Sequence, residues 1–212
     1  MLAIAVLVSG GGTNLQALLD AQRDGALHSG AIALVVSSKP DAYALRRAEL
    51  AGVKALALPK EKGESAAGYG ERLIRLLAEH HIELVVLAGF LLILDACVIR
   101  AYEGRILNVH PSLIPAFCGE GFYGLRVHEA ALARGVKLTG ATVHLVNEIA
   151  DGGRILAQRA VEVLPGDSPE TLQKRVMEEA EWVLLPRETE RLASELGGRG
   201  VWANQPQTAR KG

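Results

Sequence analysis

The sequence predicts a single-domain α/β fold with a doubly wound, mostly parallel sheet and a Rossmann-type N-terminal half. Short apolar segments alternate four times with segments whose apolar residues recur at helical spacing. The connections between them are short, which implies parallel strands joined by right-handed crossover helices. The first strand is apolar throughout, as expected of a strand that is buried on both faces.

The N-terminal half supplies the four strand and helix pairs. Leu2–Val8 is the first strand, and it stops at a run of glycines. The next three strands are expected over Ala31–Ser37, Val53–Leu58 and Leu84–Ala88. The helices between them carry the apolar residues Leu15, Leu18 and Leu19, then Leu45, Ala48 and Leu50, then the stretch Tyr69–Leu77.

The order of elements changes after residue 100. A strand over Arg105–Val109 precedes a loop rich in Gly and Pro that runs to Gly124, and a helix follows near Val127–Arg134. Two strands are expected over Ala141–Val146 and Ile155–Val163. Ser168, Pro169 and Glu170 have the sequence of a helix start, and Pro186 is expected to end or kink that helix. We expect one domain over residues 1–196 and a mobile tail over 197–212.

Composition excludes several classes of protein. The 212 residues include 23 basic and 24 acidic side chains, for a formal net charge of −1, and 49% are hydrophobic. That apolar share supports a packed core and excludes wholesale disorder. The near balance of charge gives no general attraction to polyanions, so we expect no nucleic-acid partner and no membrane partner.

Cysteine usage and the N-terminus indicate a cytoplasmic protein. Cys97 and Cys118 are too few for a disulfide framework, and neither has a Cys or His at zinc-ligand spacing. The apolar N-terminus lacks the basic region of a signal peptide. The longest apolar run, Leu84–Leu94, is shorter than the roughly 20 residues of a membrane span.

The first candidate site is the run Ser9-Gly10-Gly11-Gly12-Thr13-Asn14 between a strand and a helix. Glycines let backbone N–H groups approach an anion, and the helix N-terminus adds free donors and a favourable dipole. The spacing matches neither the Walker pattern nor the dinucleotide fingerprint. A phosphate site and a plain tight turn with a helix cap are both compatible with it.

The second and third candidates are Asn108 with His110 and, further along, Asp151. Asn108 and His110 alternate onto one face at the expected carboxyl edge of the sheet, where open α/β sheets bind ligands. An imidazole moves protons near neutral pH and an amide stabilises an oxyanion. Asp151 would raise the pKa of His110 if the two meet, although Asp-Gly is also an ordinary turn. His144 fits either the core or a supporting position, and no histidine has metal-ligand spacing, so no metal is expected.

Taken together, these motifs resemble the folate-dependent phosphoribosylglycinamide formyltransferase family over about Leu2 to Pro186. The matching stretches run over 8–16, 86–90, 107–115, 140–144 and 151–153, and their order and spacing are more specific than any one of them. The resemblance implies transfer of a formyl group from 10-formyltetrahydrofolate to the amine of glycinamide ribonucleotide, in purine synthesis. We expect no metal cofactor, and a chain that acts as a monomer or homodimer.

The resemblance also implies roles for residues of this chain. Asn108, His110 and Asp151 match the family's catalytic residues. Gly12, Thr13 and Asn14 match the residues that hold the acceptor's phosphoribosyl end, and Glu181 resembles an acid near the acceptor amine. The folate pocket is implied for Leu91, Leu92, Ile93, Leu94, Asn108, Asn147, Glu148, Ile149, Ala150 and Asp151.

The chain departs from the family pattern at several positions. Ala66 and Leu92 stand where the family usually has arginines that bind folate, and Lys60 or Lys62 is a candidate replacement for the folate tail. The loop over 117–124 is longer than the common version, and its aromatic residues cover either the site or an edge. In the last helix, Glu178 or Glu179 is an alternative to Glu181.

Three other functions remain open. A formyltetrahydrofolate deformylase uses water as the acceptor and should carry an extra N-terminal domain. A methionyl-tRNA formyltransferase should carry an RNA-binding domain and a basic surface. A non-enzymatic nucleotide-binding protein would keep the glycine run but would not need Asn108, His110 and Asp151 together.

Overall fold

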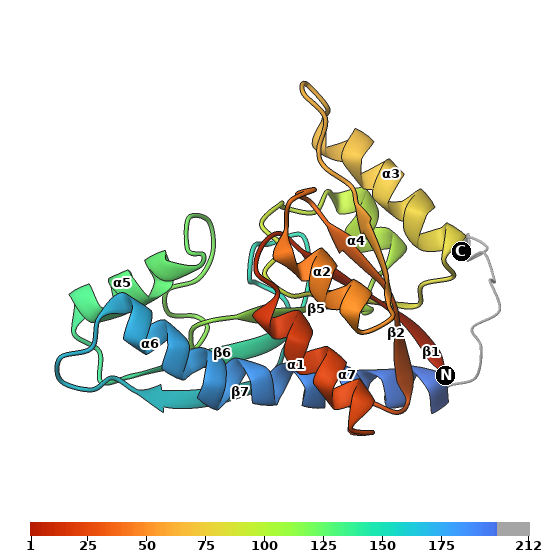
Figure 1. The fold of residues 1–212 in the computed structure, drawn as a ribbon. Helices are drawn as coiled ribbons and strands as arrows, with labels where there is room; N and C mark the ends of the chain where they lie inside the picture. The colour runs from red at the N-terminus through yellow and green to blue at the C-terminus, as the bar shows by residue number, and fades with distance from the viewer. Residues whose placement is uncertain (199–212) are drawn as a thin grey trace, which may run out of the picture.

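A seven-stranded sheet runs through the computed structural model, which describes residues 1–198 (Figure 1). The strands lie in the order β3-β2-β1-β4-β5-β6-β7; the pairs from β3 to β5 are parallel, and β6 and β7 are antiparallel. The predicted mostly parallel, doubly wound sheet is therefore confirmed. The strands are β1 (Leu2–Val8), β2 (Gly30–Ser37), β3 (Lys54–Ala57), β4 (Leu84–Leu87), β5 (Ile106–His110), β6 (Leu138–Leu145) and β7 (Ile155–Glu162).

Helices follow most strands, and one of them was not predicted. The short helix α4 begins after Asp95, whose carboxylate accepts a hydrogen bond from the Cys97 N–H. Its single turn and a half is too short to show an apolar period, so the cap residue was its only sequence signal. The helices are α1 (Thr13–Arg23), α2 (Tyr43–Leu50), α3 (Ala66–Glu79), α4 (Ala96–Ala101), α5 (Leu125–Arg134), α6 (Pro169–Val176), the π-helical turn η1 (Met177–Glu181) and α7 (Trp182–Gly198).

Two apolar cores lie on opposite faces of the sheet. Along β1, Ile4, Val6 and Val8 pack into the first core, whereas Ala5 and Leu7 pack into the second. The first core is closed by α1, α2, α6 and α7, and the second by α3 and α4. Because side chains alternate along a strand, a strand that serves both cores must be apolar throughout.

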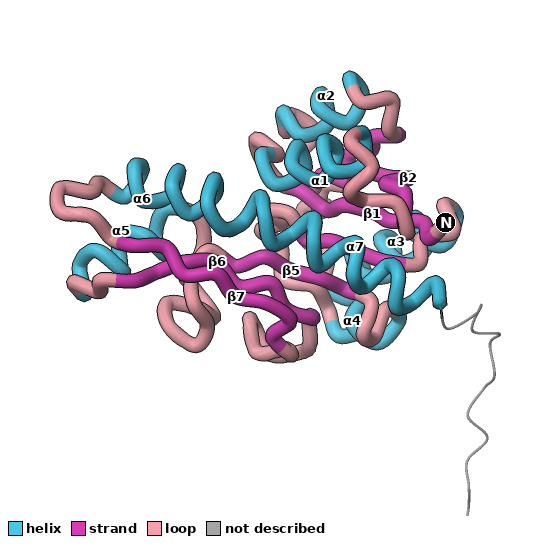
Figure 2. Tube along the Cα trace, turned by 90° about the horizontal axis from the view of Figure 1, so that it is seen from below, coloured by secondary structure: helices cyan, strands magenta, loops and turns pink. Residues whose placement is uncertain are grey.

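The C-terminal helices form one long stretch beside the antiparallel strands (Figure 2). Ser168 caps α6 and shares a capping box with Thr171, as the sequence predicted. Pro186 does not end the helix, contrary to one of the two expectations for it, and α7 continues to Gly198. Pro186 lies in the second turn after η1, where the hydrogen-bond ladder changes register, and a missing N–H is tolerated near such a change.

Gly197 and Gly198, assigned to the tail from the sequence, complete α7, and the rest of that tail lies outside the described residues. Among residues 1–198, no helix combines the length and the apolar character needed to cross a membrane.

The sheet brings three strand ends to one edge. Leu7 of β1 lies beside Leu87 of β4, which lies beside Asn108 of β5. Neighbouring strands are about 4.8 Å apart, so Asn108 lies about 10 Å from Leu7. The glycine run after β1, the segment after β4 and the polar end of β5 therefore share the carboxyl edge of the sheet, where ligands bind in such folds.

Candidate active site

Three polar side chains share one face where β5 meets β6. Asn108 and His110 are two residues apart on β5, and His144 lies opposite Asn108 in the antiparallel ladder with β6. Residues opposite one another in a ladder project from the same face. The Asn108 amide nitrogen lies 3.1 Å from His144 Nε2. Strand pairing therefore places an amide and two imidazoles together.

Asp151 completes this cluster from the loop between β6 and β7. Its carboxylate lies 3.4 Å from His110 Nδ1, 3.5 Å from His144 Nε2 and 3.5 Å from the Asn108 amide nitrogen. It also accepts a hydrogen bond of 2.9 Å from the Gly119 N–H. The three residues that the sequence singled out thus converge, together with a histidine that it left unassigned.

The loop that carries Asp151 is held by its own residues. Asn147 accepts a hydrogen bond from the Ile149 N–H and donates one to the Gly152 carbonyl. Asp151 has a positive φ of 53°. A Cβ at Gly153 would lie 1.7 Å from the Leu145 carbonyl oxygen, so no other residue fits there. The Asp-Gly-Gly sequence is needed to fold the loop back over the strands.

His110 is buried, with 4% of its surface exposed. Its Nε2 lies 2.8 Å from the Phe117 carbonyl oxygen, which only accepts, so Nε2 carries a proton. Burial lowers the pKa of His110, and the nearby Asp151 carboxylate only partly offsets this. The two residues meet and Asp151 acts on His110 in the expected direction, but desolvation outweighs that attraction, so the net shift of the pKa of His110 is downward.

Asp151 keeps its own charge. Burial alone would raise the pKa of Asp151, but the His144 ring 3.5 Å away, a hydrogen bond from the Gly119 N–H and the nearby His110 ring bring it below the ordinary value. The carboxylate therefore faces His110 Nδ1 as an acceptor. A proton on His110 Nδ1 is stabilised by the Asp151 carboxylate beside it. The Nε2–H group stays directed to the Phe117 carbonyl or to any oxygen that replaces it.

The glycine run forms a turn against the last helical stretch. Gly12 has a positive φ of 74°, and the α1 helix begins at Thr13. The Asn14 amide donates to the Glu181 carboxyl group at 2.6 Å. Burial raises the pKa of Glu181 to about 7, against the opposing effect of that hydrogen bond. Glu178 and Glu179 are exposed, so Glu181 is the acid that adjoins the run.

The segments that the resemblance assigned to folate expose apolar side chains. Leu91 is 53% exposed, Ile93 75% and Ile149 68%. Leu94 instead packs in the second core, so only its backbone is available to a ligand. The Leu91 N–H donates to the Ser9 hydroxyl at 2.9 Å, which ties this segment to the start of the glycine run.

The remaining folate candidates lie in or beside the same two segments. Leu92 is partly buried against the second core, and Asn147, Glu148 and Ala150 are exposed on the Asp151 loop. Glu148 forms an exposed ion pair of 3.3 Å with Arg100. Such a pair on the surface contributes little stability, so it leaves the loop free to meet a ligand.

The long loop over 117–124 covers one side of the cluster. The Phe117 carbonyl and the Gly119 N–H make the contacts to His110 and Asp151, and the rings of Phe117 and Phe122 meet edge to face at 6.4 Å. Tyr123 is exposed beneath Arg126. Of the two placements open for the loop, its first residues cover the site.

Sequence analysis did not predict two groups of the site, the Gly119 N–H and the His144 side chain. The Gly119 N–H is a backbone group of an irregular loop, which carries no sequence signal. His144 had one, since it is the one ionisable residue of its strand, but only the register of β5 against β6 places it beside Asn108. No group of three or more His, Cys, Asp or Glu residues within residues 1–198 could hold a metal ion.

The chain is similar to known formyl transferases in sequence and in fold. A family model described as formyl transferase matches residues 2–188. The chain is 42% identical over 177 residues to a chloroplastic phosphoribosylglycinamide formyltransferase of Arabidopsis thaliana, covering 83% of this chain. The crystal structure of glycinamide ribonucleotide transformylase 1 from Symbiobacterium toebii has a TM-score of 0.86 and 41% identity, covering 92% of this chain and 89% of that one.

Other matches differ in length or in activity. This chain spans 60% of the length of the Arabidopsis relative. It spans 13% of a trifunctional purine biosynthetic protein of Drosophila melanogaster. A formyltetrahydrofolate deformylase from Pseudomonas syringae has a TM-score of 0.80 at 28% identity, and the match covers 92% of this chain and 62% of the deformylase chain.

Proposed function

The chain belongs to the formyl transferase family, and we propose that it transfers the formyl group of 10-formyltetrahydrofolate to the amine of glycinamide ribonucleotide. The products are formylglycinamide ribonucleotide and tetrahydrofolate, which makes the reaction a step of purine synthesis. The observation that carries the proposal is the convergence of Asn108, His110 and Asp151 at the sheet edge that also holds the glycine run. Relatives named for this reaction support the choice of substrates.

Asn108 and His110 are the groups that stabilise the first step. The amine attacks the formyl carbon, the carbonyl π bond breaks, and an oxyanion forms. Asn108 has two N–H groups: one donates to His144, and the other makes only a long contact of 3.5 Å with Asp151, which the oxyanion replaces. His110 Nε2–H supplies the second donor when the oxyanion takes the place of the Phe117 carbonyl.

Asp151 and His110 carry the proton that the reaction moves. The attacking amine nitrogen becomes positively charged and loses one proton, while the departing folate nitrogen gains one. The ionised Asp151 carboxylate, reached directly or through water, accepts the first proton and passes it to His110 Nδ1, and His110 then donates its Nε2 proton to the departing nitrogen, which leaves Asp151 ionised and His110 neutral. The protein therefore ends the cycle in its starting protonation state.

The two substrates occupy neighbouring parts of the sheet edge. Gly12, Thr13 and Asn14 hold the phosphoribosyl end of the acceptor through backbone N–H groups and the dipole of α1. Glu181 lies beside Asn14 and meets the acceptor amine. The folate lies against the segments 91–94 and 147–151, where Leu91, Ile93 and Ile149 expose apolar surface.

The arginine positions of the family pattern bear on folate affinity. Ala66 begins α3 and Leu92 lies against the second core, so neither supplies a cation to the folate tail. Lys60 and Lys62 lie in the exposed loop that leads into α3 and are the candidates to replace them. We therefore expect contacts with the folate tail to affect folate binding more than they affect the rate of formyl transfer.

One experiment separates this function from its main alternative. The protein is incubated with 10-formyltetrahydrofolate with and without glycinamide ribonucleotide, and formylated product and free formate are measured. Transfer only when the ribonucleotide is present supports the proposal. Formate released at the same rate without the ribonucleotide identifies a deformylase. If neither formylated product nor formate forms, the protein is a non-enzymatic binding protein. A cytoplasmic location and a monomeric or dimeric state remain predictions.

A further inference from the structure

The glycine run is held from behind by α2. The Ala44 N–H donates to the Gly10 carbonyl at 3.1 Å, and Arg47 Nε donates to the Gly11 carbonyl at 2.8 Å. A Cβ on Gly12 would lie 2.6 Å from the Ala44 Cβ, so α2 lies directly against the run. The two carbonyls of the run therefore point toward α2.

The orientation of these carbonyls fixes the orientation of the donors. In a planar trans peptide, the C=O and the following N–H point in opposite directions. The N–H groups of Gly11 and Gly12 therefore point away from α2, toward the open side of the run. Within residues 1–198, no hydrogen bond uses the N–H groups of Gly11, Gly12, Thr13 or Asn14. They are free for an anion.

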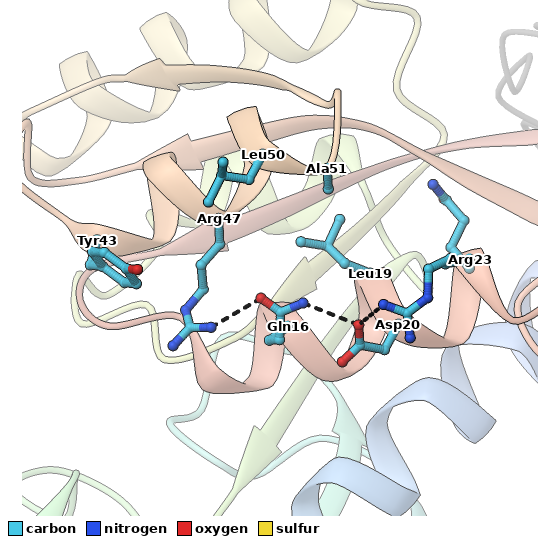
Figure 3. Close-up of a pocket in the computed structure, with 9 residues that line it drawn as sticks. Gln16, Leu19, Asp20, Arg23, Tyr43, Arg47, Leu50 and Ala51 are labelled. Atoms are coloured by element: carbon cyan, nitrogen blue, oxygen red, sulfur yellow. Dashed lines mark hydrogen bonds and ion pairs between the residues drawn. The ribbon is translucent and has the colours of Figure 1, made fainter.

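Arg47 is itself held in place, as Figure 3 shows. Its Nη1 donates to the Gln16 side chain at 3.0 Å, and Gln16 donates to Asp20 at 3.1 Å. Asp20 pairs with Arg23 at 2.8 Å, and the Arg47 guanidinium lies 5.1 Å from the centre of the Tyr43 ring. These residues line a cavity of about 560 Å³ between α1 and α2, on the side of the run away from its free N–H groups.

We propose that Arg47 is a positioning residue for the phosphate of the acceptor, acting through the Gly11 carbonyl without touching the substrate. This inference rests on the proposed acceptor site. The guanidinium fixes the plane of the Gly11–Gly12 peptide so that the Gly12 N–H faces the phosphate. Its positive charge beside the carbonyl oxygen also polarises that peptide and strengthens its N–H as a donor.

The inference predicts a selective loss. In Arg47→Ala, the KM for glycinamide ribonucleotide and the Kd for inorganic phosphate should each rise about tenfold, as expected for one charge-assisted hydrogen bond. The KM for 10-formyltetrahydrofolate and the kcat at saturating acceptor should stay within twofold. Arg47→Lys keeps the charge and one donor, and should recover most of the acceptor affinity.

A matched control separates this effect from general damage to α2. Arg46 is the preceding residue and forms only an exposed ion pair with Glu49 at 3.2 Å, so Arg46→Ala should leave both constants unchanged. A thermal melt of each variant reports folding, and amide NMR reports whether added phosphate shifts the Gly12 N–H signal. Loss of that shift in folded Arg47→Ala supports the inference.

The outcomes distinguish this inference from the proposed function. Unchanged phosphate and acceptor affinities in Arg47→Ala overturn the inference and leave formyl transfer standing. Equal losses in folate and acceptor affinity also overturn it, because they indicate a general structural effect. If the wild-type protein binds phosphate but transfers no formyl group, the proposed function fails and the phosphate measurements still decide the role of Arg47. If the wild-type protein binds no phosphate, the inference fails.

Discussion

The Asn108 amide donates from Nδ2 to His144 Nε2 across the ladder of β5 and β6, at 3.1 Å. The direction follows from the other side of the ring, where His144 Nδ1 lies 2.9 Å from the Leu145 carbonyl and carries the proton. His144 Nε2 therefore accepts the hydrogen bond in this tautomer, and the nitrogen of the amide faces it. One side chain thus fixes which end of Asn108 is presented to a substrate.

Replacement of His144 should weaken catalysis through Asn108. In His144→Ala the amide is free to turn its oxygen toward the substrate, and we expect kcat to fall about tenfold with both KM values within twofold. His144→Gln offers an acceptor again and should restore part of the rate. His80→Ala, at the C-cap of α3, is the control. A His144→Ala variant with normal kcat would show that Asn108 holds its orientation unaided.

Removal of either proposed oxyanion donor should have a larger effect. Loss of one such donor costs about 10²–10³ in kcat in a comparable site. We expect losses of that size for Asn108→Ala and His110→Ala in steady-state assays, with thermal melting midpoints close to that of the wild-type protein. Near-normal turnover in both folded variants would end the assignment of these roles.

Asp151→Asn should lower the pKa of His110 further. The Asp151 carboxylate favours the charged imidazole and opposes the larger effect of burial, so its removal leaves only the hydrogen bond to the Phe117 carbonyl to oppose burial. An NMR titration of the His110 ring should move its midpoint to lower pH. The low-pH limb of the rate profile should move in the same direction. A midpoint that stays in place would mean that Asp151 does not act on His110.

His128 should make the protein less stable in mild acid. It is fully buried on α5 without a hydrogen bond within the described residues, and burial with the nearby His110 lowers its pKa to about 4. Between about pH 6.5 and 4 the unfolded chain binds a proton that the folded chain does not, so stability falls as pH falls, by about 3 kcal/mol. Denaturant unfolding of His128→Leu should lack this dependence. An unchanged pH slope in that variant would contradict the assignment.

Glu181 should have the opposite dependence on pH. Its pKa is raised to about 7 by burial, so between about pH 4.5 and 7 the folded chain holds a proton that the unfolded chain has released. Its contribution is fully present below pH 4.5 and is lost as pH rises through 7, by about 3 kcal/mol. Glu181→Gln should remove that loss in urea unfolding measured across this range. If the free energies of unfolding of the variant and the wild-type protein differ by the same amount at pH 5 and pH 7, the pKa of Glu181 is not raised in the folded protein.

The sequence predicted most of the fold because its strands serve two cores. β1 must carry apolar residues on both faces, such as Ile4 on one and Leu7 on the other. Such continuous apolar runs differ clearly from the helical periodicity of the segments beside them. The helix α4 was missed because six residues show no period. Pro186 was misjudged because the π-helical turn before it depends on packing that no local pattern reports.

The candidate site was predicted less completely, for a related reason. Asn108, His110 and Asp151 stand out by chemistry and order in the sequence. The contact of His144 with Asn108 depends on strand register, and the protonation of His110 depends on how deeply it is buried. Both are properties of the assembled protein, so residue types and spacing did not predict them.

Because the Asp151 loop folds back over the strands, its length is restricted more tightly than its side chains. A single inserted or deleted residue displaces a chain by about 3.5 Å, which is close to the whole distance between Asp151 and His110. Substitutions at exposed positions such as Ile149 leave the span unchanged, whereas a change of length separates the carboxylate from its partners. We therefore expect the number of residues between Leu145 and Ile155 to be under stricter selection than most of the side chains they carry.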